Sequence, residues 1–177
     1  MSRSFEVGFR AVKDGTLVVA LGNPQRGDDG VGAAVVARLA ALPLPADVEL
    51  TDGGTPGLET ALLLRDCRRA IIVDAAQMDI EPGDWQRFAP DAVSLRMADN
   101  RGTLHSAGLA EALALGDALG ILPSDIIIYG VQPAVIGWRP GLSAAVSAAV
   151  PNVAAAILDE LLDSRMNTDG KRQDTGR

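Results

Sequence analysis

A short apolar run near the start of the chain, TLVVALGNP at residues 16–24, decides the fold. Its first six residues are apolar or β-branched throughout, which is typical of a strand buried on both faces. The glycine and asparagine that follow tolerate left-handed backbone angles, and Pro24 cannot donate a ladder hydrogen bond, so the strand should end there. A helix is expected from about Asp29 to Leu42, where apolar side chains recur at helical spacing, and Asp28 or Asp29 can cap its first turn.

The same cycle of strand and helix repeats along the chain. Strands are predicted at 48–51, 70–74, 85–88 and 125–131, and helices at 56–65, 106–119 and 142–163. Pro151 should kink the last helix. Apolar strands that alternate with helices indicate an α/β fold with a mostly parallel sheet covered by helices on both faces. We expect an N-terminal extension at residues 1–14, a single α/β domain at 15–164, and a disordered tail at 165–177.

Composition limits the classes of protein that fit the chain. Its 177 residues, 47% of them apolar, suffice for one domain with one core. No apolar run approaches the roughly 20 residues of a membrane span, and the N-terminus lacks the order of a signal peptide. Cys67 is the only cysteine, expected to be buried and inert. These features predict a cytoplasmic protein that does not bind membranes.

The charge balance argues against a nucleic-acid partner. A formal net charge of −7 should repel phosphate backbones unless basic residues cluster. Arg65, Arg68 and Arg69 do cluster, but three arginines beside a helix end are expected to form a solvated rim.

The loop after the first strand, GNPQRGDD at residues 22–29, has the glycine spacing of a phosphate-binding loop. Two aspartates stand where that motif needs Lys and Ser or Thr, and they would repel a triphosphate. Asp52 sits where a ribose-binding acid would sit, but the glycine fingerprint of dinucleotide-binding proteins is absent. No organic cofactor is therefore expected. The zinc-protease and serine-hydrolase motifs are absent as well.

Carboxylates lie at the ends of the first three predicted strands. Asp28 and Asp29 follow the first strand, Asp52 ends the second, and Asp74 ends the third. In parallel sheets the carboxyl ends of the strands share one edge, where ligands bind near a switch in strand order. His105, the only histidine, starts a predicted helix, whose dipole favours a neutral imidazole.

With Asp29 and Asp74, His105 would form a nitrogen and oxygen ligand set with open positions, suited to nickel, zinc or a similar divalent ion. Each residue also has an ordinary structural explanation. Asp29 can cap a helix, Asp74 can accept hydrogen bonds from loop amides, and His105 can lie on the surface. A metal site or an acid–base site is thus one interpretation of this edge.

Several segments, taken in order, resemble the sequence blocks of the hydrogenase maturation proteases. They are VVALGNPQRGDDGVG at 18–32, DGGTPG at 52–57, IIVDA at 71–75, HSAGL at 105–109, and the strand at 126–131 with the Gln-Pro pair after it. Together they span roughly residues 17–161. Any one block is weak evidence, but their order along the chain is specific.

The resemblance implies a three-layer sandwich in which a twisted sheet lies between helices. It implies an endopeptidase that removes the C-terminal extension of a nickel-iron hydrogenase large-subunit precursor after nickel insertion. The metal-contacting positions of the family fall on Asp29, Asp74 and His105, and Asp29 or Asp74 would act as the catalytic base. The first position is Glu in some members, so Asp28 stays an alternative to Asp29. The resemblance also implies a substrate-binding loop made of Asp52, Gly53, Gly54 and Thr55.

A site with three ligands and open positions is poorly suited to holding a metal permanently. We therefore expect the precursor to supply the nickel, which acts as a recognition signal, and we expect the chain to be a monomer. Two alternatives remain. One is a nickel-dependent docking or chaperone module that does not cut the precursor. The other is an esterase like peptidyl-tRNA hydrolase, which shares the LGNP element at 21–24, but its pattern continues to a His-Asn pair where this chain has Asp28 and Asp29.

Overall fold

The computed structural model describes residues 14–91 and 104–174. Five strands form one sheet in the order β2-β1-β3-β5-β4. Their bounds are β1 Thr16–Ala20, β2 Val48–Asp52, β3 Arg69–Ala75, β4 Trp85–Phe88 and β5 Asp125–Val131. Four of the strands run parallel, and β4 pairs antiparallel with β5 at one edge. The predicted mostly parallel sheet is confirmed.

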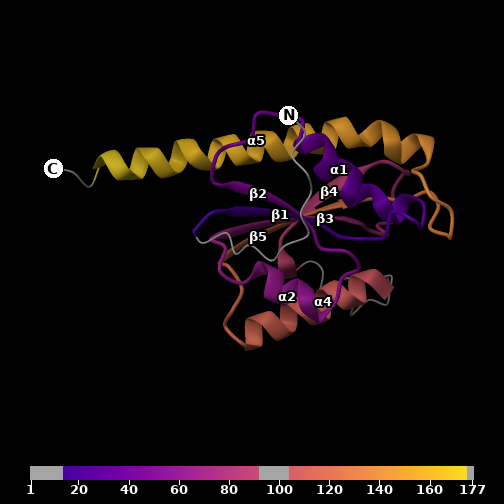
Figure 1. The fold of residues 1–177 in the computed structure, drawn as a ribbon, viewed down its shortest axis with the longest axis horizontal. Coiled ribbons are helices and arrows are strands. Elements are labelled where there is room, and N and C mark those ends of the chain that lie inside the picture. Colours follow the sequence, from indigo (N-terminus) through magenta and orange to yellow (C-terminus); the bar gives the residue numbers. More distant parts are fainter. Residues whose placement is uncertain (1–13, 92–103, 175–177) are drawn as a thin grey trace.

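Helices cover both faces of this sheet. Their bounds are α1 Val31–Leu39, α2 Leu58–Leu64, α4 Leu104–Ala118 and α5 Ala144–Asp174. Figure 1 shows α1 and α5 on one side of the sheet and α2 and α4 on the other. The α/β class and the three-layer arrangement are therefore confirmed.

Two apolar clusters hold the layers together, because successive side chains of a strand point to opposite faces. In β1, Val18 and Ala20 pack toward α1 and α5, whereas Leu17 and Val19 pack toward α2 and α4. Side chains of β3 alternate in the same way: Ile71 packs in the cluster toward α1 and α5, and its neighbours Ala70 and Ile72 pack in the cluster toward α2 and α4. With few aromatic residues, these cores consist mainly of Val, Ile, Leu and Ala.

The start of the first helix differs from the prediction. Asp28 and Asp29 form a short 3-10 turn, η1 (Asp28–Gly30), and α1 begins only at Val31. No side chain caps either element, so the predicted capping role of the two aspartates is wrong. Asp28 instead accepts hydrogen bonds from amides of the distant loop after β5, and Asp29 accepts one from the amide of Asn23, six residues earlier in its own loop.

The end of the chain also differs from the prediction. Helix α5 continues through Pro151 as far as Asp174, so residues 165–174, expected to be a disordered tail, are helical. Its C-terminal part extends beyond the sheet (Figure 1). The predicted extension at residues 1–14 lies, apart from Asp14, outside the described residues. The division of the chain into domains otherwise stays a prediction.

Among the described residues, one segment, Ala144–Asp163, is long and apolar enough to cross a membrane by length and composition alone. The prediction that no such run exists was wrong, because the valine, isoleucine, leucine and alanine residues of this helix give it a mean hydropathy of 1.5. The segment nevertheless places Val146, Val153 and Ile157 in the core against the sheet. A core helix passes the same test of length and composition, so the segment is weak evidence for a membrane span.

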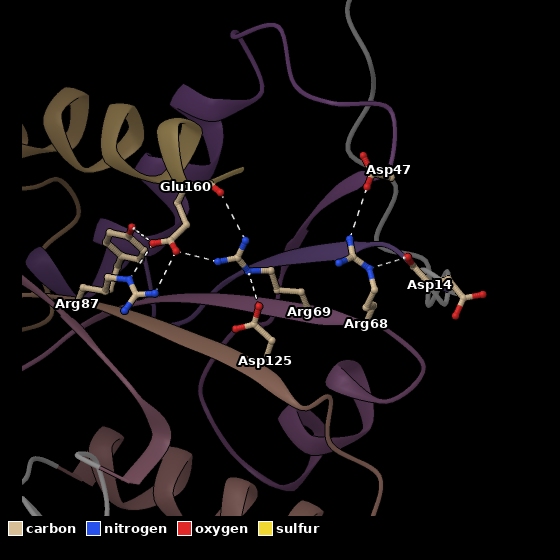
Figure 2. Close-up of polar contacts among 8 residues, drawn as sticks. Asp14, Asp47, Arg68, Arg69, Arg87, Asp125 and Glu160 are labelled. Carbon is tan, nitrogen blue, oxygen red and sulfur yellow. Dashed lines mark hydrogen bonds and ion pairs between the residues drawn. The ribbon is translucent and has the colours of Figure 1, made fainter. Parts of the chain in front are cut away.

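A charged cluster ties α5 to the sheet (Figure 2). Glu160 accepts hydrogen bonds from Arg69, Arg87 and Tyr129, at 2.8, 2.8 and 2.9 Å. Arg69, which also pairs with Asp125 at 3.0 Å, is only 5% exposed. The predicted solvated rim is therefore wrong for Arg69, which starts an interior strand. Arg69 and Asp125 are the first residues of β3 and β5. Their ion pair therefore lies at the edge of the sheet where the parallel strands begin, opposite the edge where they end.

Candidate functional site

The strand order places a switch point between β1 and β3. These neighbouring parallel strands are joined to partners on opposite sides, since the chain leaves β1 toward β2 and leaves β3 toward β4 and β5. The loops after two such strands separate and leave a crevice at their carboxyl ends, where α/β proteins bind ligands. The residues at this switch point are those that follow β1 and those that end β3.

Asp74 lies at the carboxyl end of β3 and is 4% exposed. Its Oδ1 accepts a hydrogen bond from the amide of Ala75 at 2.8 Å. Burial, reinforced by the negative charge of Asp29, raises the pKa of Asp74 to about 7. A carboxyl group with such a pKa can hold or release a proton near neutral pH, which is typical of acid–base catalysts.

Asp29 lies in the turn that follows β1 and is 1% exposed. Its Oδ2 accepts a hydrogen bond from the amide of Asn23 at 2.9 Å. Because its charge acts on Asp74, the two carboxyl groups belong to one site. Two buried carboxylates that repel each other favour binding of a cation or a shared proton. This is the electrostatic environment that the prediction of a metal or acid–base site requires.

Asp28, the alternative to Asp29, has a different environment. Its Oδ2 accepts hydrogen bonds from the amides of Ala134 and Val135, at 2.8 and 2.9 Å, and its Oδ1 accepts one from Ser143 at 2.6 Å. Burial alone would raise the pKa of Asp28, but these hydrogen bonds outweigh it and lower the pKa. Asp28 therefore holds the loop between β5 and α5 in place and stays ionised, whereas Asp29 is the residue that interacts with Asp74.

His105 lies in the first turn of α4, as predicted, but its side chain is outside the described part of the structure. Gly108, in the second turn of α4, packs closely against Pro56: a Cβ atom added to this glycine would lie only 2.5 Å from the carbonyl oxygen of Pro56. The helix thus begins against the loop that follows β2. Among the side chains that the structure describes, which exclude His105, no three potential metal ligands come together.

The loop at residues 52–55 joins the site from the β2 side. Gly53 donates its amide to the carbonyl of Ala20 at 2.8 Å, and the carbonyl of Gly54 accepts from Gly22 at 2.9 Å. Asp52 is exposed, and its Oδ1 accepts a hydrogen bond from the amide of Gly54 at 2.9 Å. Thr55 is exposed as well. The loop after β1, the loop after β2 and the start of α4 therefore meet at the same edge of the sheet.

Gln132 is a residue of this edge to which the sequence analysis gave no role in the site, although it belongs to the Gln-Pro pair of the last family block. It follows β5 and is 4% exposed. Its Oε1 accepts a hydrogen bond from the amide of Met78 at 2.7 Å, and its Nε2 donates to the carbonyl of Pro133 at 3.1 Å. Gln132 therefore joins the segment after β3 to the segment after β5. The signal in the sequence was this Gln-Pro pair directly after an apolar strand.

Comparison with known proteins places the chain in a family. The family model described as hydrogenase maturation protease matches residues 33–160. The chain therefore belongs to the hydrogenase maturation protease family, a family of peptidases. The resemblance found in the sequence blocks is confirmed.

Relatives and solved structures agree with this membership. The hydrogenase expression/formation protein HupD of Rhodobacter capsulatus is 34% identical over 118 residues, which are 66% of this chain and 56% of HupD. A protein of Methanocaldococcus jannaschii named as a hydrogenase maturation protease is 30% identical over 162 residues, 84% of this chain and 97% of that protein. The structure of the hydrogenase maturating endopeptidase HybD from Escherichia coli superimposes with a TM-score of 0.76 at 28% identity, covering 85% of this chain and 93% of HybD. The chain spans a little over half the length of HupD.

Proposed function

We propose that this chain is an endopeptidase that removes a C-terminal extension from the large-subunit precursor of a nickel-iron hydrogenase once nickel has been inserted. The observation that carries the proposal is the pair of buried, interacting carboxyl groups, Asp29 and Asp74, at the switch point of a chain that belongs to this family. We further propose that the nickel is part of the substrate and signals that the precursor is ready.

The chemistry of the donor set fits a divalent ion. Burial and the charge of Asp29 raise the pKa of Asp74, and a cation placed against the two carboxyl groups would offset both effects. His105 would add a neutral nitrogen donor from the first turn of α4, which packs on the loop next to the site. Carboxylate and imidazole ligands suit nickel, and three ligands leave positions for those of the precursor. Asp28 is not needed as a ligand, because three backbone amides already occupy its carboxylate.

Peptide-bond hydrolysis needs a base that takes a proton from the attacking water. We assign this role to Asp74, the buried carboxyl group at the end of β3; its pKa of about 7 is that of the metal-free site, and a bound cation would lower it. Asp52 and Thr55 are exposed beside the site, so we assign the loop at residues 52–55 to contact the extended C-terminal segment of the precursor. We expect the protein to act in the cytoplasm as a monomer.

The test compares nickel-loaded and nickel-free precursor by intact mass. We expect loss of a C-terminal peptide only from the nickel-loaded form, and no loss with Asp74→Asn or His105→Ala. Asp79→Asn is the matched control, since Asp79 is exposed, follows the same strand, and loses the same charge. Equal cleavage of both precursor forms would contradict nickel recognition. A stable complex with uncut precursor would instead favour a docking or chaperone module.

A further inference from the structure

The loop between β5 and α5 presents large apolar side chains to solvent. Trp138 is 82% exposed, Val135 56% and Ile136 38%. We call residues 134–139 the Trp138 loop. Single exposed apolar residues are common, but three within four residues, one of them a tryptophan, form a contiguous candidate for a partner contact.

The backbone of the Trp138 loop is held tightly beside the site. Asp28 binds the amides at the start of the loop through its carboxylate and donates its own amide to the carbonyl of Val135 at 3.0 Å. Gly27 and Ile136 form an isolated β-bridge, and Gly137 donates its amide to the carbonyl of Arg26 at 3.3 Å. The exposed side chains therefore lie on a fixed backbone, which is attached to the three residues that precede Asp29. Preorganisation of this kind lowers the entropy lost on binding.

Basic side chains accompany the apolar ones. The guanidinium carbon of Arg26 lies 5.6 Å from the centroid of the Trp138 ring, a cation–π arrangement. Arg26 Nε is buried and has no hydrogen-bond partner within the described part of the chain. Arg139 is exposed on the same loop. In a chain with a net charge of −7, this surface is locally apolar and basic.

We propose that the Trp138 loop is the docking surface for the hydrogenase large-subunit precursor, an inference that rests on the proposed function. The fitting partner surface is an apolar pocket for the indole, bordered by carboxylates that face Arg26 and Arg139. Tryptophan and arginine are the side chains that most often dominate binding energy at protein interfaces. A partner seated on this loop would lie next to Asp29, so docking would bring its metal centre to the carboxyl edge of the sheet.

The experiment measures the affinity of immobilised nickel-loaded precursor for the full chain and its variants. Trp138→Ala should weaken binding about 30-fold, as expected for a central interface residue. Trp138→Phe should restore most of the affinity. Leu119→Ala is the control, because Leu119 is 59% exposed and follows the far end of α4, about 20 Å along the helix from its first turn. Thermal unfolding of all three variants checks that the fold is retained.

The outcomes separate this inference from the proposed function. Weakened binding for Trp138→Ala, with wild-type binding for Leu119→Ala, supports the docking surface. If the wild-type chain cleaves the precursor and Trp138→Ala binds it equally well, only the docking surface is overturned. If the wild-type chain neither binds nor cleaves the precursor, the proposed function fails and the docking surface fails with it. A wild-type dimer that Trp138→Ala converts to a monomer would assign the loop to a second copy of the chain, which also overturns the proposal.

Discussion

Replacement of Asp28 by asparagine tests the division of labour between the two adjacent aspartates. In the structure the carboxylate of Asp28 accepts three backbone hydrogen bonds, from Ala134, Val135 and Ser143. Asparagine keeps the shape but has one acceptor oxygen. If that oxygen faces Ala134 and Val135, the new amide group points its own donors at the amide of Ser143.

The expected destabilisation follows from these contacts. One charge-assisted hydrogen bond is lost and one buried donor is left unpaired, which together cost about 3 kcal/mol. For a domain of this size that corresponds to a fall in Tm of about 6–12 °C. Asp52→Asn is the matched control: its carboxylate is exposed and accepts one amide hydrogen bond from Gly54 at 2.9 Å, so Tm should fall by less than about 3 °C.

Two measurements check the prediction for Asp28→Asn. Calorimetry gives the change in Tm, and hydrogen–deuterium exchange reports whether the amides of Ala134, Val135 and Ser143 lose protection. We expect both effects in Asp28→Asn and neither in Asp52→Asn. A Tm within about 2 °C of the wild type, with these amides still protected, would refute the assignment of Asp28 as the residue that holds the Trp138 loop.

Three further predictions follow from the contacts of other residues. The hydrogen bond from Arg87 is the main reason that the pKa of Glu160 is lowered from 4.5 to about 2. The ionised Glu160 carboxylate should therefore stabilise the folded protein fully above pH 4.5, and this stabilisation should be lost as the pH falls toward 2. Urea unfolding should show that Glu160→Gln lowers the free energy of unfolding by about 2 kcal/mol at pH 7, allowing for partial exposure. The variant should also lose less stability than the wild type between pH 4.5 and pH 2. Burial raises the pKa of the Cys67 thiol to about 11, so a thiol reagent at pH 8 should modify Cys67 only after unfolding, and rapid labelling of the native protein would contradict this. Gly22→Ala should give insoluble or inactive protein, because Gly22 has a φ of 110° and a Cβ there would lie 1.9 Å from the carbonyl oxygen of Asp29; soluble, active protein with wild-type Tm would show that the turn adapts.

Element types and the fold class could be predicted from the sequence because the signals are local. The apolar strand at residues 16–21 and its Gly-Asn-Pro stop depend on side chains that are neighbours in the chain. The position of Asp74 at the end of β3 follows from the same kind of pattern. The boundary of α1 does not follow from such a pattern, because Asp28 and Asp29 precede the helix without capping it. The hydrogen bonds of Asp28 reach a loop more than 100 residues away in the sequence, and no local pattern reveals that.

The opening segment by itself determined that the chain begins its domain with a buried parallel strand, and the ordered blocks determined the family. Only the tertiary structure decided which of two adjacent aspartates interacts with Asp74 and which anchors a distant loop. It also decided that Arg69 is buried and that Trp138 lies beside the site. The physical reason is that burial, pKa shifts and long-range hydrogen bonds arise where separate strands and loops meet, whereas strand and helix patterns are written in residues that are close in the chain.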